Sequence, residues 1–339
     1  MLQWLLMPGA FRFFLPSLII SAIALAGIFF YGGLPAFIIA VLLSILEVTL
    51  SFDNAVINAR VLERMSPIWQ RRFLTWGILF AVFGTRLILP ILIVSLVVWV
   101  SPIFIASLAV LDPLQYAHLL EDSRYAINAF GASFLIMVSL KYFMDESKEK
   151  HWLRVIEHHL SQWGRIESIE IAIALTLLVT ISFLVPGDAS TTVLISGIIG
   201  VVLFLIMQGI TSSFSLTTTT IATSGLALFM YLNILDSAFS LDSVVGAFAL
   251  STSIPIIAVG LGIGAYFVRS MTVFLVRKRT LDSIIYLEHG AHWAVFGLAI
   301  SMLAGLLVEV PEIITGGIGL LFVVAAYYSS VALRGKVGV

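Results

Sequence analysis

Two stretches of this chain place carboxylate, hydroxyl and amide side chains at the same spacing. The first, EVTLSFDNAVINARVL, runs from Glu47 to Leu62, and the second, DSAFSLDSVVGAFAL, runs from Asp236 to Leu250. Each has an acid, then a serine, then an aspartate followed by an amide or a hydroxyl. Such oxygen-bearing side chains are the ligands that Mn²⁺, Ca²⁺ and Mg²⁺ prefer. The aligned pairs are Glu47 with Asp236, Ser51 with Ser240, Asp53 with Asp242, and Asn54 with Ser243.

On a continuous helix, the spacing of these residues predicts a polar stripe in each stretch. Glu47, Ser51, Asn54 and Asn58 follow one another by four, three and four residues, so they share a face. Asp53 lies about 100° away from Asn54, and local unwinding near Ser51 and its counterpart would bring all four carboxylates together. We therefore predict Glu47, Asp53, Asn54, Asp236 and Asp242 as metal ligands, with Ser51, Asn58, Ser240 and Ser243 beside them.

Each motif is followed by another apolar segment with a single arginine, Arg86 in the first half and Arg269 in the second. These arginines could pair with the acids in a network that serves packing only. They could instead act as counter-charges that hold an empty site together and release the carboxylates when a cation enters. Arg269 could also snorkel to the membrane interface, because the basic cluster 277–279 follows closely. A proton relay without a metal is a further alternative.

Histidine pairs occur at two further places. His289 and His292 in YLEHGAHWA share a helical face, which suits metal binding or proton transfer, or else an interfacial or structural role. His158 and His159 could bind metal or belong to a solvated face. The chain has no cysteine, which excludes thiolate ligands, disulfides and thiol catalysis. It has no nucleotide-binding loop or hydrolase motif either, so we expect neither enzymatic activity nor a nucleic-acid partner.

The elements that carry these residues are predicted to be membrane-spanning helices. Hydrophobic residues make up 60% of the 339 residues and charged residues 11%, where soluble domains carry about 25% charged residues. A span needs about 20 apolar residues, and the segment from Ser101 to Asp112 is too short, so we expect it to be re-entrant or interfacial. The predicted spans are 13–31, 36–58, 73–99, 125–143, 169–185, 192–210, 222–250, 254–276, 292–308 and 313–333.

Basic residues concentrate in 60–72, 141–165, 277–279 and 334–336, which should be cytoplasmic. We therefore expect a multi-pass protein of the bacterial inner membrane with both termini in the cytoplasm. The apolar run from Phe13 to Tyr31 is too long for a cleavable signal, so we expect it to be the first span. The organisation predicted is a first transmembrane half (1–144), a cytoplasmic amphipathic linker helix (145–167) and a second transmembrane half (168–339).

In this topology the two motif helices cross the membrane in opposite directions, so the repeat is inverted. Inverted repeats are typical of secondary transporters, whose substrate sites lie near the membrane midplane. The predicted fold is an all-α transmembrane bundle of about nine or ten spans with two inverted repeats.

The motifs also resemble a known family. Glu-x-x-x-Ser-x-Asp-Asn and Asp-x-x-Phe-Ser-x-Asp-Ser are similar to the paired signatures of the TerC-like membrane proteins. The run GLGIGAYFVRSMTVFLVRKRTLDSIIYLEHGAHWA resembles a branch described only as a domain of unknown function. The resemblance implies a relative of the LysE-type exporters, among which some members export manganese and others are linked by name to tellurium resistance. This chain departs from the pattern at Val244, Val245 and Gly246, where better-known members have Ile-Pro-Ala.

We therefore expect a transporter of divalent cations, with Mn²⁺ as the first candidate and Ca²⁺ or Mg²⁺ as others, that works by alternating access around the acidic site. The cation would be the substrate, no cofactor would be permanently bound, and the lipid bilayer would be the surrounding partner. A homo-oligomer stays open. The alternative is a membrane-embedded metal-dependent enzyme or a stress-response scaffold of the tellurium-resistance type.

Overall fold

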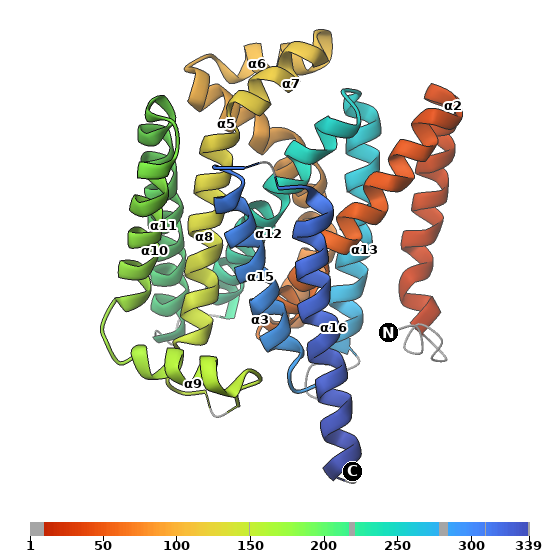
Figure 1. The fold of residues 1–339 in the computed structure, drawn as a ribbon. Helices are drawn as coiled ribbons and strands as arrows, with labels where there is room; N and C mark the ends of the chain where they lie inside the picture. Colours follow the sequence, from red (N-terminus) through yellow and green to blue (C-terminus); the bar gives the residue numbers. More distant parts are fainter. Residues whose placement is uncertain (1–9, 149, 217–220, 278–283, 309, 338–339) are drawn as a thin grey trace. The chain divides into compact units, whose positions relative to one another are not determined.

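In the computed structural model, the described backbone covers residues 10–148, 150–216, 221–277, 284–308 and 310–337. Side chains at 10–13, 74, 211–216, 221–224, 241–242, 249, 312–313 and 334–337 are not described. Every regular element in these ranges is a helix (Figure 1). The helices are α2 (Ala10–Leu50), α3 (Phe52–Glu63), α4 (Pro67–Leu79), η1 (Phe80–Ile88), α5 (Leu89–Val98), α6 (Pro102–Leu111), α7 (Pro113–Asp122), α8 (Arg124–Phe143), α9 (Arg154–Trp163), α10 (Ile169–Leu184), α11 (Gly187–Leu216), α12 (Ile221–Leu250), α13 (Ile254–Arg277), α15 (Leu287–Ala304) and α16 (Glu312–Val337).

Six of the described helical segments are long and apolar enough to cross a membrane, which makes the chain a multi-pass membrane protein. Each of the ten predicted spans falls on a helix, but length and composition support six. The four missing spans are accounted for as follows. The segment Phe14–Leu50 covers two predicted spans, and the described apolar stretch of α12, Gly225–Ser240, is shorter than 18 residues. The helix α10 has only 16 residues, and α15 has Glu288, His289 and His292 in its first turns. The helix α6 has ten residues, about 15 Å, so it is too short to span, as predicted. The six segments are Phe14–Leu50, Pro67–Val98, Arg124–Phe143, Gly187–Ile210, Ile254–Arg277 and Ile314–Leu333.

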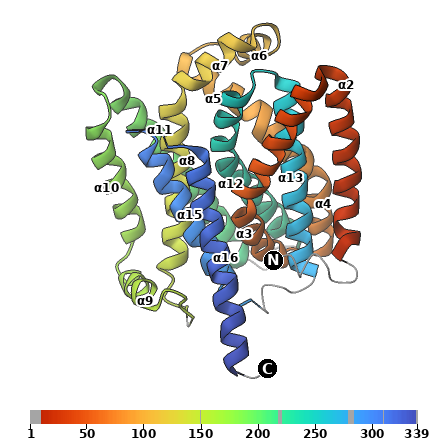
Figure 2. The ribbon, with the colours of Figure 1, turned by 45° about the vertical axis from the view of Figure 1, so that its right-hand side comes forward.

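The first of these segments is a helical hairpin. Its 37 residues would measure about 55 Å if straight, against a hydrocarbon core of about 30 Å. Gly33 interrupts it with φ 69° and ψ −163°, a conformation that is essentially restricted to glycine. The chain reverses there, and Figure 2 shows the two arms of α2 meeting at one end. The turn accounts for the two spans predicted at 13–31 and 36–58.

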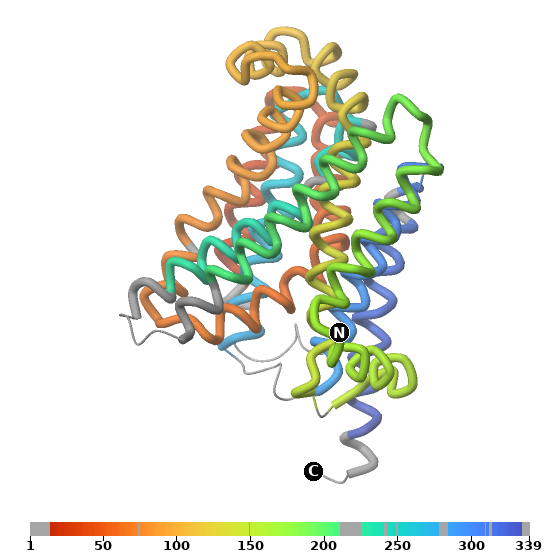
Figure 3. The backbone as a smooth tube through the Cα atoms, turned by 90° about the vertical axis from the view of Figure 1, so that its left-hand side faces the viewer, coloured from red at the N-terminus to blue at the C-terminus, as the bar shows by residue number. Residues whose placement is uncertain are grey.

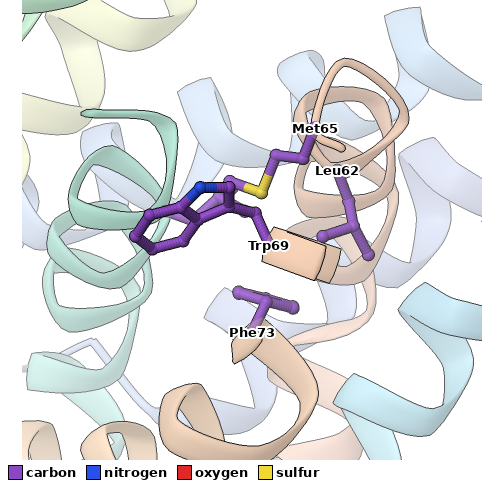
Figure 4. Packing of buried hydrophobic residues seen from close by; sticks show 5 residues of the cluster. Leu62, Met65, Trp69 and Phe73 are labelled. Carbon is purple, nitrogen blue, oxygen red and sulfur yellow. The ribbon is translucent and has the colours of Figure 1, made fainter. Parts of the chain in front are cut away.

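The chain divides into two compact units, and the first combines Met1–Ser123 with Leu228–Thr280. In it, α13 packs against both arms of α2. The Ser17 and Ser270 hydroxyl oxygens lie 2.5 Å apart, and Ser44 Oγ donates a 3.0 Å hydrogen bond to the carbonyl oxygen of Gly260. A separate apolar core joins α3, α4 and α12. It consists of Leu62, Met65, Trp69, Phe73 and Leu232, of which Figure 4 labels the first four.

Residues 67–98 form one uninterrupted helical rod, drawn in orange in Figure 3. Its middle section, η1, has π-helical hydrogen bonding. Such widened turns are rare and occur frequently at functional sites. The widened turn here contains Arg86, one of the two arginines singled out from the sequence.

The second compact unit combines Arg124–Ala227 with Leu281–Val339. The helix α9 lies across the ends of α8 and α10 (Figures 1 and 2). The predicted linker segment 145–167 contains α9 (Arg154–Trp163), with Glu157 and Ser161 buried and Val155 and Trp163 exposed. Both compact units draw on segments from before and after α9. The predicted division into two inverted halves stays a prediction.

Candidate functional site

The first acidic motif lies at a break between two helices. The helix α2 ends at Leu50 and α3 begins at Phe52, while Ser51 between them has φ −101° and ψ 15°. The backbone N–H of Asn54, in the first turn of α3, donates a 2.9 Å hydrogen bond to Asp53 Oδ1. The predicted interruption is therefore confirmed at Ser51. It was wrong at Ser240, where α12 continues without a break.

Glu47 and Arg86 form a fully buried ion pair. Glu47 Oε1 accepts hydrogen bonds from Arg86 Nη2 and, at 2.8 Å, from Ser51 Oγ. The exposed fractions of the two side chains are 0% for Glu47 and 2% for Arg86. Arg86 Nη1 donates to the carbonyl oxygen of Ala81 at 2.6 Å, inside the widened turn of η1. The π-helical turn thus orients the arginine toward the first motif.

Asp236 and Arg269 form a second, looser pair in the same unit. Their closest charged atoms, Arg269 Nη2 and Asp236 Oδ2, lie 3.6 Å apart without a hydrogen bond. Arg269 Nη1 donates to the carbonyl oxygen of Phe73 at 3.0 Å, and the guanidinium lies over the Phe73 ring. The arginine is 3% exposed. This burial and the approach to Asp236 favour the counter-charge alternative for Arg269 over snorkelling.

A direct side-chain contact joins the two motifs. Asn54 Nδ2 donates a 2.8 Å hydrogen bond to Asp236 Oδ1, and both residues are buried. Glycine makes room for the charged side chains beside this contact. A Cβ atom added to Gly264 would lie 2.4 Å from Glu47 Cγ, and one added to Gly77 would lie 2.5 Å from Arg269 Nη1. Larger residues at either position would displace the ion pairs.

The structure joins six of the thirteen predicted site residues around the two ion pairs. Asp242 lies on α12, but its side chain is outside the described residues. Ser243 Oγ donates to the carbonyl oxygen of Ser240, and both serines are buried. The two histidines belong to the other compact unit. The residues gathered around the two ion pairs are Glu47, Ser51, Asn54, Arg86, Asp236 and Arg269.

Sequence reasoning missed Asn233. It lies on α12, three residues before Asp236, and is 1% exposed. The missed signal was the stripe itself, because the series Asp236, Ser240, Ser243 extends back by one turn to Asn233.

Several buried oxygen atoms of this unit have no hydrogen-bond donor among the described residues. Burying a polar atom without a partner costs about 1–3 kcal/mol, so these oxygens are available to accept a hydrogen bond or to bind a cation. Among the described side chains, no group of three or more His, Asp or Glu residues could hold a metal ion by itself. A cation held here would need amide and hydroxyl oxygens as well. The unpartnered atoms are Glu47 Oε2, Asn54 Oδ1, Asn58 Oδ1, Asn233 Oδ1, Asp236 Oδ2 and Ser240 Oγ.

The histidines of the second unit have structural partners. His289 Nδ1 lies 2.8 Å from Glu157 Oε2, and His292 stacks on Tyr142 with ring centroids 3.4 Å apart. His292 Nδ1 also lies 2.9 Å from the carbonyl oxygen of Glu288. These contacts favour the structural alternative for the pair.

Glu157 fastens α9 to the beginning of α15, a role that its sequence context did not indicate. Its carboxylate also accepts hydrogen bonds from Trp293 Nε1 and the backbone N–H of Trp152, both at 2.9 Å. Burial alone would raise the pKa of Glu157. The hydrogen bond and charge of His289, with the bonds from Trp293 and Trp152, outweigh burial and lower the pKa to about 2. Nearby, burial lowers the pKa of Lys148 to about 7.

Comparison with known proteins places the chain in a family. No curated protein and no solved structure matched it. The match to a protein family begins at residue 52, just after the break at Ser51, and runs to residue 336. It includes α3, both arginines, the second acidic motif and the histidines of α15. This family carries the description "Protein of unknown function (DUF475)", and because the match covers most of the 339 residues, the chain belongs to it.

Proposed function

We propose that this protein transports a divalent cation across the bacterial inner membrane, with export of Mn²⁺ as the first expectation. The substrate site is formed by the two acidic motifs, with Glu47, Asp53, Asp236 and Asp242 as its carboxylates. Transport proceeds by alternating access of two inverted halves and draws on the proton gradient. The protein has both termini in the cytoplasm and performs no catalysis.

The observation that carries this proposal is the set of buried, unpartnered oxygens on the two motif segments. Glu47 Oε2 and Asp236 Oδ2 are carboxylate oxygens without a hydrogen-bond donor among the described residues. Hard cations such as Mn²⁺, Ca²⁺ and Mg²⁺ bind such oxygens. Ionised carboxylates inside a membrane are rare and usually functional. A bound cation would satisfy these atoms and neutralise their charge.

The charge balance agrees with a divalent substrate. With all four acids ionised, the site together with Arg86 and Arg269 carries two net negative charges, which one divalent cation neutralises. In the structure each arginine stands beside one acid, Arg86 at Glu47 and Arg269 at Asp236. The cation takes over the carboxylate oxygens, and the two arginines stay in the site as counter-charges. The 3.6 Å separation at Asp236 makes that pair the easier one to open.

The resemblance of the motifs to the TerC-like membrane proteins supports the substrate class. Members of that group are linked to manganese export, and the group is related to the LysE-type exporters. The equivalent spacing of the acids in the two motifs supports the inverted repeat, since secondary transporters place such repeats around a midplane site.

The test is cation flux in proteoliposomes that contain the purified protein. We would measure Mn²⁺, Ca²⁺, Mg²⁺ and Zn²⁺ movement with and without an imposed pH gradient. The variant Asp53→Asn keeps the side-chain volume and removes the charge, and it should abolish flux while leaving the protein folded. The matched control is Asp188→Asn, because Asp188 is exposed at the start of α11.

Flux of one cation that is lost in Asp53→Asn and kept in Asp188→Asn supports the proposal. Equal flux in wild type and Asp53→Asn would remove Asp53 from the site. Absence of flux for every cation under either gradient would overturn transport, and the metal-dependent enzyme or the stress-response scaffold would take its place.

A further inference from the structure

The side chain of Asn233 has one of its two polar ends fixed and the other free. Its Nδ2 donates a 2.7 Å hydrogen bond to the carbonyl oxygen of Phe229, one turn earlier on α12. Its Oδ1 is buried and has no donor among the described residues. Exchanging the amide oxygen and nitrogen would place two acceptors against each other. The free end of Asn233 is therefore an oxygen.

Asn54 has the same arrangement on the opposite element. Its Nδ2 donates to Asp236 Oδ1, which leaves Asn54 Oδ1 without a donor among the described side chains. Asp236 itself keeps Oδ2 without a hydrogen bond. Asn233 lies three residues before Asp236, on the same helical face. Three unpartnered oxygens therefore belong to Asp236, to Asn54, which is hydrogen-bonded to it, and to Asn233, which lies one turn before it.

This trio differs from an acidic cluster because two of its three oxygens are neutral. Carboxamide oxygens are ordinary ligands of Ca²⁺ and other hard cations, whereas Zn²⁺ favours nitrogen and sulfur ligands. Neutral ligands complete a coordination shell without adding negative charge inside the membrane, where each extra carboxylate is costly. The two amides thus suit a hard cation beside a single carboxylate that already faces Arg269.

We infer that Asn233 is a cation ligand which, together with Asp236 and Asn54, selects hard, oxygen-preferring divalent ions over Zn²⁺. This inference rests on the proposed function and adds a ligand that the paired motifs do not contain. Asn233 carries no charge, so it adds affinity and selectivity for hard cations without adding to the negative charge that the carboxylates supply.

The experiment is equilibrium binding of Mn²⁺ to the purified full chain in nanodiscs, with Zn²⁺ as the competing ion. Asn233→Ala removes the oxygen and should weaken Mn²⁺ binding at least tenfold while reducing the preference over Zn²⁺. Asn233→Asp retains an oxygen ligand and should keep Mn²⁺ binding. Asn128→Ala, an asparagine of the other compact unit, is the matched control and should bind like wild type.

The outcomes separate this inference from the proposed function. If wild type and Asn233→Ala bind Mn²⁺ equally while Asp236→Asn does not, Asn233 is not a ligand although the site stands. If Asn233→Ala and Asn233→Asp lose binding alike, its role is only to hold α12. If wild type binds no divalent cation, the proposed function itself is overturned. Should Asn233→Ala not fold, Asn233→Ser takes its place with the same expected loss.

Discussion

Asn54 on α3 donates a hydrogen bond of 2.8 Å to Asp236 on α12, across 182 positions of sequence. Each residue belongs to one of the two acidic motifs, so the contact joins the two copies directly. Asn54 and Asp236 are 1% and 5% exposed, and water therefore has little access to either partner. Removing one partner of such a buried hydrogen bond leaves the other partner unsatisfied, which destabilises the folded protein.

Replacing Asn54 by alanine should leave Asp236 Oδ1 buried without a donor. The expected destabilisation is about 1–3 kcal/mol, the usual cost of an unsatisfied buried polar group. Thermal unfolding of the purified protein in detergent measures it. Asn128→Ala should produce a smaller shift, and an equal shift in both variants would show that the contact contributes nothing specific.

The buried pair of Glu47 and Arg86 predicts strong non-additivity. Glu47→Gln alone leaves the Arg86 charge without its partner, and breaking a buried pair in this way costs about 3–5 kcal/mol. The double variant Glu47→Gln with Arg86→Gln removes both charges and should recover much of that loss. Unfolding measurements on both single variants and the double variant form the required cycle. Additive losses would mean that the two side chains do not interact.

Gly264→Ala should destabilise the protein through a steric clash. Gly262→Ala, on the same helix α13, is the control for the change in helix propensity. A Cβ atom at Gly264 would lie 2.5 Å from Glu47 Cβ, so Gly264→Ala forces α2 and α13 apart, at a cost of about 1–3 kcal/mol. At Gly262 the nearest atom, on Val82, is 3.3 Å away. Alanine improves helix propensity at both positions, so the difference in melting temperature between the two variants reports the clash. Indistinguishable melting temperatures would refute it.

Glu157 predicts a pH dependence in the second unit. Its pKa is lowered from 4.5 to about 2, so its contribution to holding α9 is complete above pH 4.5. That contribution should be lost as the pH falls from 4.5 toward 2, because protonation is then easier in the undocked state. Limited proteolysis between α8 and α10 at graded pH, with an acid-stable protease, measures the loss.

The control variant for this pH effect is Glu157→Gln, which cannot titrate. It should be cleaved faster than wild type at neutral pH and show no further change between pH 4.5 and 2. A pH response of the same size in Glu157→Gln would assign the effect to another group.

The sequence was sufficient to predict the helical membrane class and the positions of most of the membrane-spanning helices. A run of about 20 apolar residues has few alternatives to a spanning helix, because backbone polar groups must be satisfied within the segment. The same local logic located the acidic motifs and predicted the break at Ser51. It misjudged Ser240, because α12 carries a similar polar pattern in an unbroken helix.

Segment length and hydropathy explain why ten spans were predicted while six helical segments meet the criteria for a span. The α10 and α15 helices are apolar runs at the margin of spanning length or hydropathy, where composition alone does not decide. The turn at Gly33 depends on a backbone conformation that other residues rarely adopt. A glycine within an apolar run does not by itself predict such a turn.

The contacts between distant residues were decided only by the tertiary structure. The direction of Arg269, the fit of Glu47 against Gly264 and the clamp from Glu157 to His289 all join segments far apart in the chain. Periodicity fixes which face of its own helix a residue occupies. It does not specify which neighbouring helix that face meets. The sequence therefore determined which chemical groups this protein keeps inside the membrane, and helix packing decided which of them pair.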